Sequence, residues 1–262
     1  MKILLILLAT VGPVFAAGPQ LLVREARGKP APLHIDEIAI NITVAGDVAE
    51  TTILVGIKNT THRPLERDFV MPLPKGATVS TYALDVNGQM RRGVAVEKER
   101  ARFAYESIKA RNIDPGYVER QAGNVYRTKI FPIMPNSVKR VQLGYVETLP
   151  MVDGRLRYTL PCEFGVPIKK FTCSIRGTGG TKITLQDHLD LTFTEDPFGK
   201  LEAKARDKTI NGTLTLAARL PKLPALMVET IDSEKDRFFS LTDLAPDRGA
   251  TAARATPGSV LL

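Results

Sequence analysis

Alternation of apolar and polar residues with a period of two is the feature of this sequence that most limits its fold. Between Ile38 and Val44, four branched apolar residues occupy every second position, and small or polar residues occupy the positions between them. Gly46 and Asp47 can then turn the chain into a second alternating segment at 51–57. Because successive side chains of a strand point to opposite faces, this pattern predicts a half-buried β-hairpin.

The same alternation returns along most of the chain. Further alternating or apolar segments lie at 79–86, 125–131, 138–147, 156–160, 171–175, 182–185, 189–193, 214–218, 226–231 and 238–241. Asn87-Gly88 is a strong hairpin signal, because both residues tolerate a positive φ. Many short strands with turns between them are typical of β-sandwiches and not of βαβ units. We therefore predict a mainly β protein made of one or two antiparallel β-sandwiches.

One segment departs from the β pattern. From residue 97 to residue 111, Ala101, Ala104, Tyr105 and Ile108 follow the spacing i, i+3, i+4, i+7. This spacing draws a single apolar stripe on a helix, and the remaining face is charged. The sequence thus predicts one amphipathic helix, packed on a sheet through that stripe.

The first 16 residues have the pattern of a secretory signal peptide. Lys2 supplies a charged start, residues 3–15 are apolar, and the small residues Ala16 and Ala17 follow. No later segment is long and apolar enough to cross a bilayer. We expect residues 1–16 to be removed and the remaining protein to be secreted, periplasmic or attached to a cell surface.

The two cysteines leave two alternatives open. Cys162 and Cys173 lie 11 residues apart, on segments that the pattern predicts to be neighbouring strands. They could form one disulfide in an oxidising compartment, or they could be independent buried thiols. A metal site is not expected, because His34, His62 and His188 lie far apart and none has ligand spacing with a cysteine.

Positive charge is concentrated in residues 91–140. This segment holds 12 Lys or Arg against 5 Asp or Glu, so it carries +7 of the +8 net charge of the chain. Arg91, Arg92, Arg100 and Arg102 are the candidate residues for binding a polyanion such as acidic polysaccharide or an anionic surface. The alternative is an ordinary solvated face. Export makes nucleic acid the least favoured polyanion.

Five short pieces of sequence occur in a fixed order between Phe69 and Pro150. The pieces are Phe69-x-x-Pro72-Leu73-Pro74, then Gly88, then Glu97-Lys98-x-x-Ala101-x-x-x-Tyr105, then Ile133-x-Pro135-x-x-Val138, and last Leu143-x-Tyr145-x-Glu147-x-Leu149. Together they resemble the VIT (vault protein inter-alpha-trypsin) domain family, over residues 20–150. Asn136 stands where the family usually has glycine, and asparagine is the best substitute if a positive φ is required there.

The resemblance implies an arrangement that composition cannot reveal. In proteins of this kind the domain usually precedes a von Willebrand A domain, which carries a metal-dependent Asp-x-Ser-x-Ser adhesion site. Residues 249–262 are expected to be a linker and the truncated start of such a domain. The divalent cation would then lie downstream, and we expect no metal ligand or cofactor in this chain. Residues 151–248 are either a second β-rich region or an extension of the first sandwich.

The residues that carry the resemblance have architectural explanations. Ala101 and Tyr105 would press the predicted helix onto a sheet, and Glu97 would favour the positive end of its dipole. We therefore predict a non-catalytic adhesion or scaffold module that binds protein, extracellular matrix or a cell-surface ligand. A polyanion-binding module is the first alternative. A secreted hydrolase using Glu97 or Asp114 is less favoured, because the sequence has no recognisable nucleophile motif.

Overall fold

The computed structural model describes residues 24–25, 34–93, 117–121, 124–221, 226–232 and 237–243. All regular elements within these residues are β-strands, so the prediction of a mainly β protein is confirmed. The predicted signal peptide, the predicted helix at 97–111 and the predicted linker at 249–262 lie outside the described residues.

The strands form one large sheet, two smaller sheets and a hairpin. The large sheet has the order β14 (Thr194–Glu195), β15 (Leu201–Lys208), β12 (Ile168–Gly177), β2 (His34–Ala45), β3 (Val48–Lys58), β9 (Val138–Thr148), β5 (Thr78–Val86) and β6 (Gln89–Arg92). One four-stranded sheet has the order β1 (Arg24–Glu25), β4 (Leu65–Pro72), β8 (Val125–Ile133) and β7 (Tyr117–Gln121). The other has the order β10 (Met151–Val152), β11 (Arg155–Glu163), β16 (Asn211–Arg219) and β13 (Lys182–His188). The hairpin pairs β17 (Leu226–Asp232) with β18 (Arg237–Asp243).

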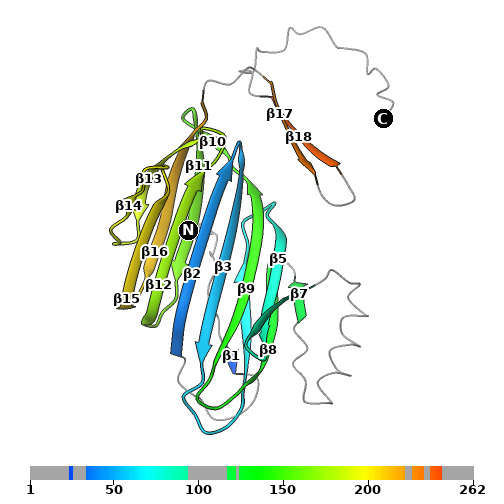
Figure 1. The fold of residues 1–262 in the computed structure, drawn as a ribbon, viewed down its shortest axis with the longest axis vertical. Coiled ribbons are helices and arrows are strands. Elements are labelled where there is room, and N and C mark those ends of the chain that lie inside the picture. Colours follow the sequence, from blue (N-terminus) through cyan, green and yellow to red (C-terminus); the bar gives the residue numbers. More distant parts are fainter. Residues whose placement is uncertain are drawn as a thin grey trace, which may run out of the picture.

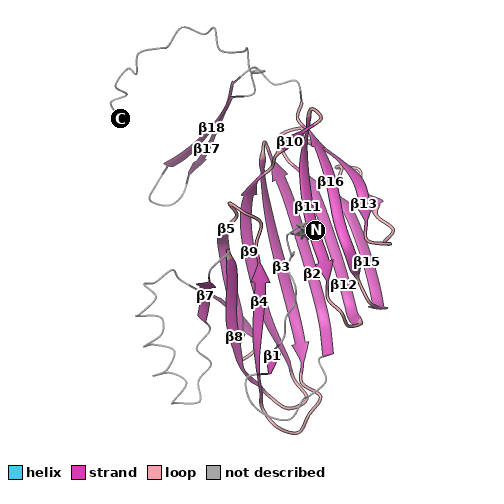
Figure 2. Ribbon diagram, turned by 180° about the vertical axis from the view of Figure 1, so that it is seen from behind, coloured by secondary structure: helices cyan, strands magenta, loops and turns pink. Residues whose placement is uncertain are grey.

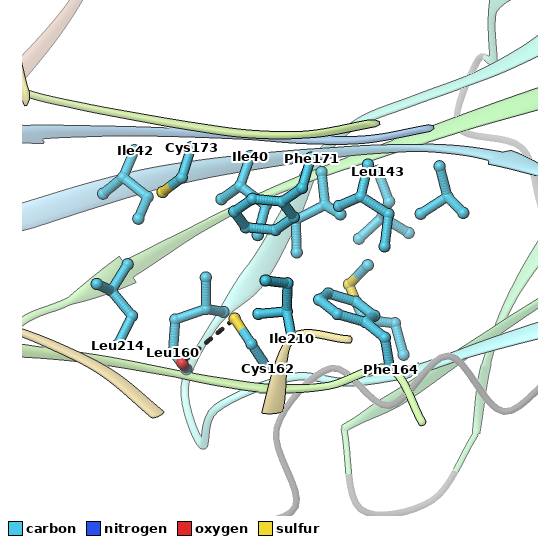
Figure 3. Close-up of a cluster of buried hydrophobic side chains, with 14 of the residues drawn as sticks. Ile40, Ile42, Leu143, Leu160, Cys162, Phe164, Phe171, Cys173, Ile210 and Leu214 are labelled. Atoms are coloured by element: carbon cyan, nitrogen blue, oxygen red, sulfur yellow. Dashed lines mark hydrogen bonds between the residues drawn. The ribbon is translucent and has the colours of Figure 1, made fainter. Parts of the chain in front are cut away.

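Two layers of strands enclose the core. The large sheet is one layer, and the two four-stranded sheets share the other (Figures 1 and 2). Figure 3 shows Ile40, Phe171 and Cys173 of the large sheet facing Leu160 and Leu214 of the opposite layer. All of these side chains are at most 1% exposed and belong to one continuous apolar cluster. The period-two alternation thus places one face of each strand in this cluster.

One strand pair in the large sheet is parallel. Strand β12 runs beside β2 in the same direction, with Phe171 opposite Ile38 and Ile175 opposite Ile42. The other pairs in the described sheets are antiparallel, as the sandwich prediction expects. Strands from both sides of Pro150 therefore share one sheet and one core. The alternation could not reveal this pair, because it reports which face is buried and not the direction of the neighbouring strand.

Turn residues lie where the sequence predicts them. Asn87 and Gly88 both have positive φ, 55° and 82°, and connect β5 to β6 as a two-residue hairpin turn. Gly46, with a φ of 57°, begins the turn from β2 to β3. Asn136 has a φ of 54°, so it occupies a position that does require the left-handed region. These positions explain the glycine and asparagine choices in the sequence.

Candidate functional site

The described residues of the VIT-like pattern lie in the core and in turns. Phe69, Leu73 and Tyr145 are buried, and Gly88 is exposed in its turn. Pro72 and Pro74 are partly buried at the end of β4, and Pro135 is partly buried in the turn between β8 and β9. Four further members of the pattern lie outside the described residues, namely Glu97, Lys98, Ala101 and Tyr105. Where it can be placed, the pattern therefore specifies packing and chain reversal.

A cluster of hydroxyl groups lies in the core where β9 faces β11. The hydroxyls of Thr51 and Tyr158 form a buried hydrogen bond of 2.7 Å, which joins the large sheet to the sheet that contains β11. Tyr145 lies directly opposite Thr51 in the large sheet, and its hydroxyl is buried without a hydrogen bond of ordinary geometry. Burial raises the pKa of Tyr145 and of Tyr158, so both phenols stay protonated. Neither phenol is available as a base.

Glu147 extends the same inner face of β9 beyond Tyr145. Its side chain is partly buried, and its Oε1 atom is buried without a hydrogen-bond partner among the described residues. Burial raises the pKa of this carboxyl from 4.5 to about 7. A carboxyl that holds its proton near neutral pH can act as a general acid, but it needs a pocket that admits a substrate. The cavity on the outer face of β11 and β16, which Arg155, Arg157 and Ala217 line, does not include Glu147.

Sequence reasoning missed Thr51 and Tyr158 as members of this cluster. Thr51 lies between Ala49 and Ile53 on the buried face of β3, and Tyr158 lies between Leu156 and Leu160 on the buried face of β11. A polar side chain in phase with buried apolar ones needs a hydrogen-bond partner. The alternation could therefore have marked both residues as buried polar groups, although it could not have paired them.

A second group of polar side chains joins the large sheet to the sheet that contains β4 and β8. The hydroxyls of Tyr82 on β5 and Thr128 on β8 form a hydrogen bond of 2.8 Å. The carboxylate of Asp68 on β4 is buried and pairs with Arg127 on β8. These contacts hold strands together within and between layers.

The two cysteines are free thiols in the structure. Cys162 lies on β11 and Cys173 on β12, which are consecutive strands of the chain but belong to different sheets. Both are buried in the apolar core (Figure 3). Burial raises the pKa of both thiols, that of Cys173 to about 12, which disfavours the reactive thiolate.

In the described part of the basic segment, three of the cations form ion pairs. Arg127 pairs with Asp68, Lys129 lies 3.8 Å from Glu66, and Arg140 lies 3.2 Å from Glu37. The acidic partners lie on the adjacent strand β4 and on β2, and these ion pairs reduce the positive charge that the segment presents to a binding partner.

Arg91 and Arg92 are the described members of the proposed polyanion-binding set. Both are exposed, and they end strand β6 at one edge of the large sheet. Arg100 and Arg102 lie outside the described residues, so the structure brings together only half of the predicted set. The described residues of the set therefore form a small cationic strand end at β6.

The described part of the chain contains no group of three or more His, Cys, Asp or Glu side chains that could hold a metal ion. No helix found there has the length and apolar character needed to cross a membrane.

Comparison with known proteins identifies the domain. Residues 35–145 match the family model of the vault protein inter-alpha-trypsin domain. These residues form a VIT domain. The domain begins in β2 and ends in β9, so the VIT match covers the five strands β2, β3, β9, β5 and β6 of the large sheet together with β4, β7 and β8.

Two curated proteins are similar to the VIT region. Protein mono-ADP-ribosyltransferase PARP4 of Mus musculus is 24% identical over 126 residues, which are 48% of this chain and 6% of that protein. Inter-alpha-trypsin inhibitor heavy chain H4 of Homo sapiens is 24% identical over 118 residues, 45% of this chain and 13% of that protein. The chain thus spans a small part of the length of either relative.

Solved structures resemble the chain more loosely. A protein of Legionella pneumophila assigned to nutrient binding has a TM-score of 0.47 at 13% identity, covering 71% of this chain and 66% of that chain. An M1 zinc metallopeptidase from Deinococcus radiodurans has a TM-score of 0.40 at 13% identity, covering 85% of this chain and 50% of that chain. At such scores neither structure supports an inference about function.

Proposed function

We propose that this chain is an exported, non-catalytic VIT module that presents a downstream, metal-dependent von Willebrand A domain for binding to protein or extracellular matrix. The observation that carries the proposal is the placement of the described VIT-pattern residues in the core and in turns. Side chains in such positions give a rigid body its shape. A rigid body that performs no reaction can still orient a neighbouring binding domain.

The polar chemistry of the described core supports a non-catalytic role. The phenols of Tyr145 and Tyr158 and the thiol of Cys162 have raised pKa values because they are buried, so each is held in its unreactive, protonated form. The similarity to a heavy chain of inter-alpha-trypsin inhibitor supports partners of the protein class. Export is supported by the signal-peptide pattern of residues 1–16.

The natural full-length product tests this proposal. We expect its sequence to continue after Leu262 into a strand that ends in Asp-x-Ser-x-Ser. Its binding to immobilised extracellular-matrix proteins should require Mg²⁺, should be lost in chelator, and should be absent from residues 17–262 alone. A continuation without that motif, or binding that chelator leaves unchanged, would contradict the proposal.

The exposed strand end at Arg91 and Arg92 supports a second candidate function, the binding of acidic polysaccharide. Neither guanidinium has an ion pair with another described residue, so both are free to contact an anion. On a heparin column, the double change Arg91→Ala and Arg92→Ala should lower the salt concentration at which the protein elutes. The matched control removes two exposed cations elsewhere, Arg176→Ala and Lys182→Ala. Equal retention of the two double variants would rule out a specific role for the strand end.

A further inference from the structure

A shallow hollow lies on the outer face of the sheet that contains β10, β11, β16 and β13. Its volume is about 260 Å³, and Arg155, Arg157, Asp153 and Gln186 line it. Arg155 and Arg157 alternate with the buried residues of β11, so they point away from the core. None of these residues belongs to the VIT pattern or to the basic segment at 91–140.

The hollow exists because a small residue forms its floor. Ala217 on β16 lies opposite Arg157 on β11 and opposite Thr184 on β13. It faces outward in register with these long or polar side chains, yet it is only 4% exposed. The side chains around Ala217 therefore stand above it and form the walls of a depression. A larger side chain at this position would fill the depression without changing its charge.

The charges around the hollow are arranged for one kind of ligand. Arg155 and Arg157 are two positions apart on one strand face, and neither has an ion pair with a described residue. Unpaired guanidinium groups bind a carboxylate through paired, charge-assisted hydrogen bonds. Asp153 lies at the rim, in the two-residue turn between β10 and β11, where its φ is 50°. Its carboxylate repels a multiply charged anion but accepts hydrogen bonds from hydroxyl groups.

We propose that this hollow binds a single uronic acid unit of an acidic polysaccharide. The sugar carboxylate would lie on Arg155 and Arg157, and its hydroxyl groups would bond to Gln186 and Asp153. A volume of about 260 Å³ suits one small unit, because pockets for drug-sized ligands begin at about 300 Å³. The proposal goes beyond the second candidate function, since it places the same class of ligand at a separate site on β11 and does not depend on Arg91 and Arg92.

Titration calorimetry with trigalacturonate tests the proposal on the exported chain. We expect the double variant Arg155→Ala with Arg157→Ala to bind at least about tenfold more weakly than the unchanged protein, because charge-assisted hydrogen bonds are lost. Ala217→Leu should weaken binding to a similar degree while leaving every charge in place. Both arginines are exposed, so the double variant should keep its melting temperature; Arg155→Lys with Arg157→Lys should retain part of the affinity.

The matched control is Lys170→Ala with Arg176→Ala, which removes two exposed cations from β12 in the opposite layer. This variant should bind trigalacturonate as the unchanged protein does. If the Arg155 and Arg157 variant also keeps full binding, or if the unchanged protein does not bind trigalacturonate, the hollow is not the site. Heparin retention that depends on Arg91 and Arg92 would still support the second candidate function in either case. Equal affinity for inorganic sulfate, or for the methyl ester of the sugar acid, would overturn the assignment to a uronic acid.

Discussion

At the scale of single residues, two hydrogen-bonded pairs of hydroxyl groups connect the two layers of this sandwich. Thr51 bonds to Tyr158 in one half of the molecule, and Tyr82 bonds to Thr128 in the other. Each pair joins the large sheet to one of the two smaller sheets. A buried hydroxyl that loses its partner costs more free energy than the bond itself contributes. The pairs therefore favour one alignment of the layers over others.

The pair formed by Thr51 and Tyr158 gives a direct prediction about stability. Tyr158→Phe leaves the Thr51 hydroxyl buried and unpaired, and we expect the free energy of unfolding to fall by about 1–3 kcal/mol. Thr51→Val should have a similar effect, because it leaves the Tyr158 hydroxyl buried and unpaired, and valine otherwise has nearly the same shape as threonine. The double variant should be less destabilised than the sum of the single variants, since no unpaired hydroxyl of the pair remains. Urea unfolding of the four proteins measures this coupling, and strict additivity would show that the bond contributes nothing.

Glu147 predicts how stability depends on pH. Burial raises its pKa in the folded protein from 4.5 to about 7, so the folded state keeps a proton that the unfolded state releases. The contribution of the Glu147 carboxyl to the free energy of unfolding is therefore complete below pH 4.5 and is lost as the pH rises through 7. Glu147→Gln should remove this loss and raise the free energy of unfolding at pH 8 by about 1–2 kcal/mol, since solvent reduces the full effect of the shift.

Unfolding by urea at pH 4.5, 6 and 8 would check the role of Glu147. Glu163 on β11 is an exposed glutamate, so Glu163→Gln is a matched control that should leave the pH profile unchanged. Equal profiles for the Glu147 variant and the unchanged protein would mean that the Glu147 carboxyl is already ionised in the folded state.

At the scale of an element, the hairpin of β5 and β6 depends on the backbone of one glycine. A side chain at Gly88 would meet no atom within 4 Å, but its φ is 82°. Gly88→Ala should therefore destabilise the protein by about 1 kcal/mol through backbone strain alone. Gly88→Asn should cost less, because asparagine tolerates a positive φ. Thermal unfolding of both variants checks the order, and a smaller loss for alanine than for asparagine would contradict it.

The same hairpin shows which features of an element can be read from its sequence. Asn87-Gly88 predicts both the turn and its position, because few other residue pairs adopt two successive positive φ angles. Asn136 is similar, since its side chain tolerates the φ of 54° that the turn requires. Local backbone chemistry acts within a few residues, so a single sequence contains it. The hollow above Ala217 is different, because Ala217 lies on β16 between β11 and β13, two strands that are distant from it in the sequence.

At the scale of the molecule, the sequence predicted the class of fold but not the partners of its strands. The alternation from Ile38 to Val44 correctly marks one buried face. It does not indicate that β12, more than 100 residues later, runs parallel to β2. The partner of Thr51 on β11 was hidden for the same reason. Such contacts depend on loop closure and on packing between distant segments, which a periodic pattern does not record.

The parallel pair makes a prediction about the smallest part of the chain that folds. The VIT match ends at residue 145, but the inner face of β2 packs against residues from after Pro150, including Leu160 and Leu214 (Figure 3). A chain that ends at Pro150 would leave this face and the hydrogen-bonding edge of β2 exposed. Each large apolar side chain returned to water costs about 1.5–3 kcal/mol. We therefore expect this short chain to lack a cooperative unfolding transition and to bind a hydrophobic dye.

A chain that ends at Pro221 is the matched control, because it keeps every strand of the large sheet and of the sheet opposite β2. It should unfold cooperatively, with a denaturation midpoint close to that of the whole chain. Circular dichroism and urea unfolding distinguish the two truncations. Cooperative unfolding of the chain that ends at Pro150, with a similar midpoint, would show that the VIT domain is stable without the strands that follow it. Those strands would then be a separate addition to the domain, and the shared core would not be needed for its stability.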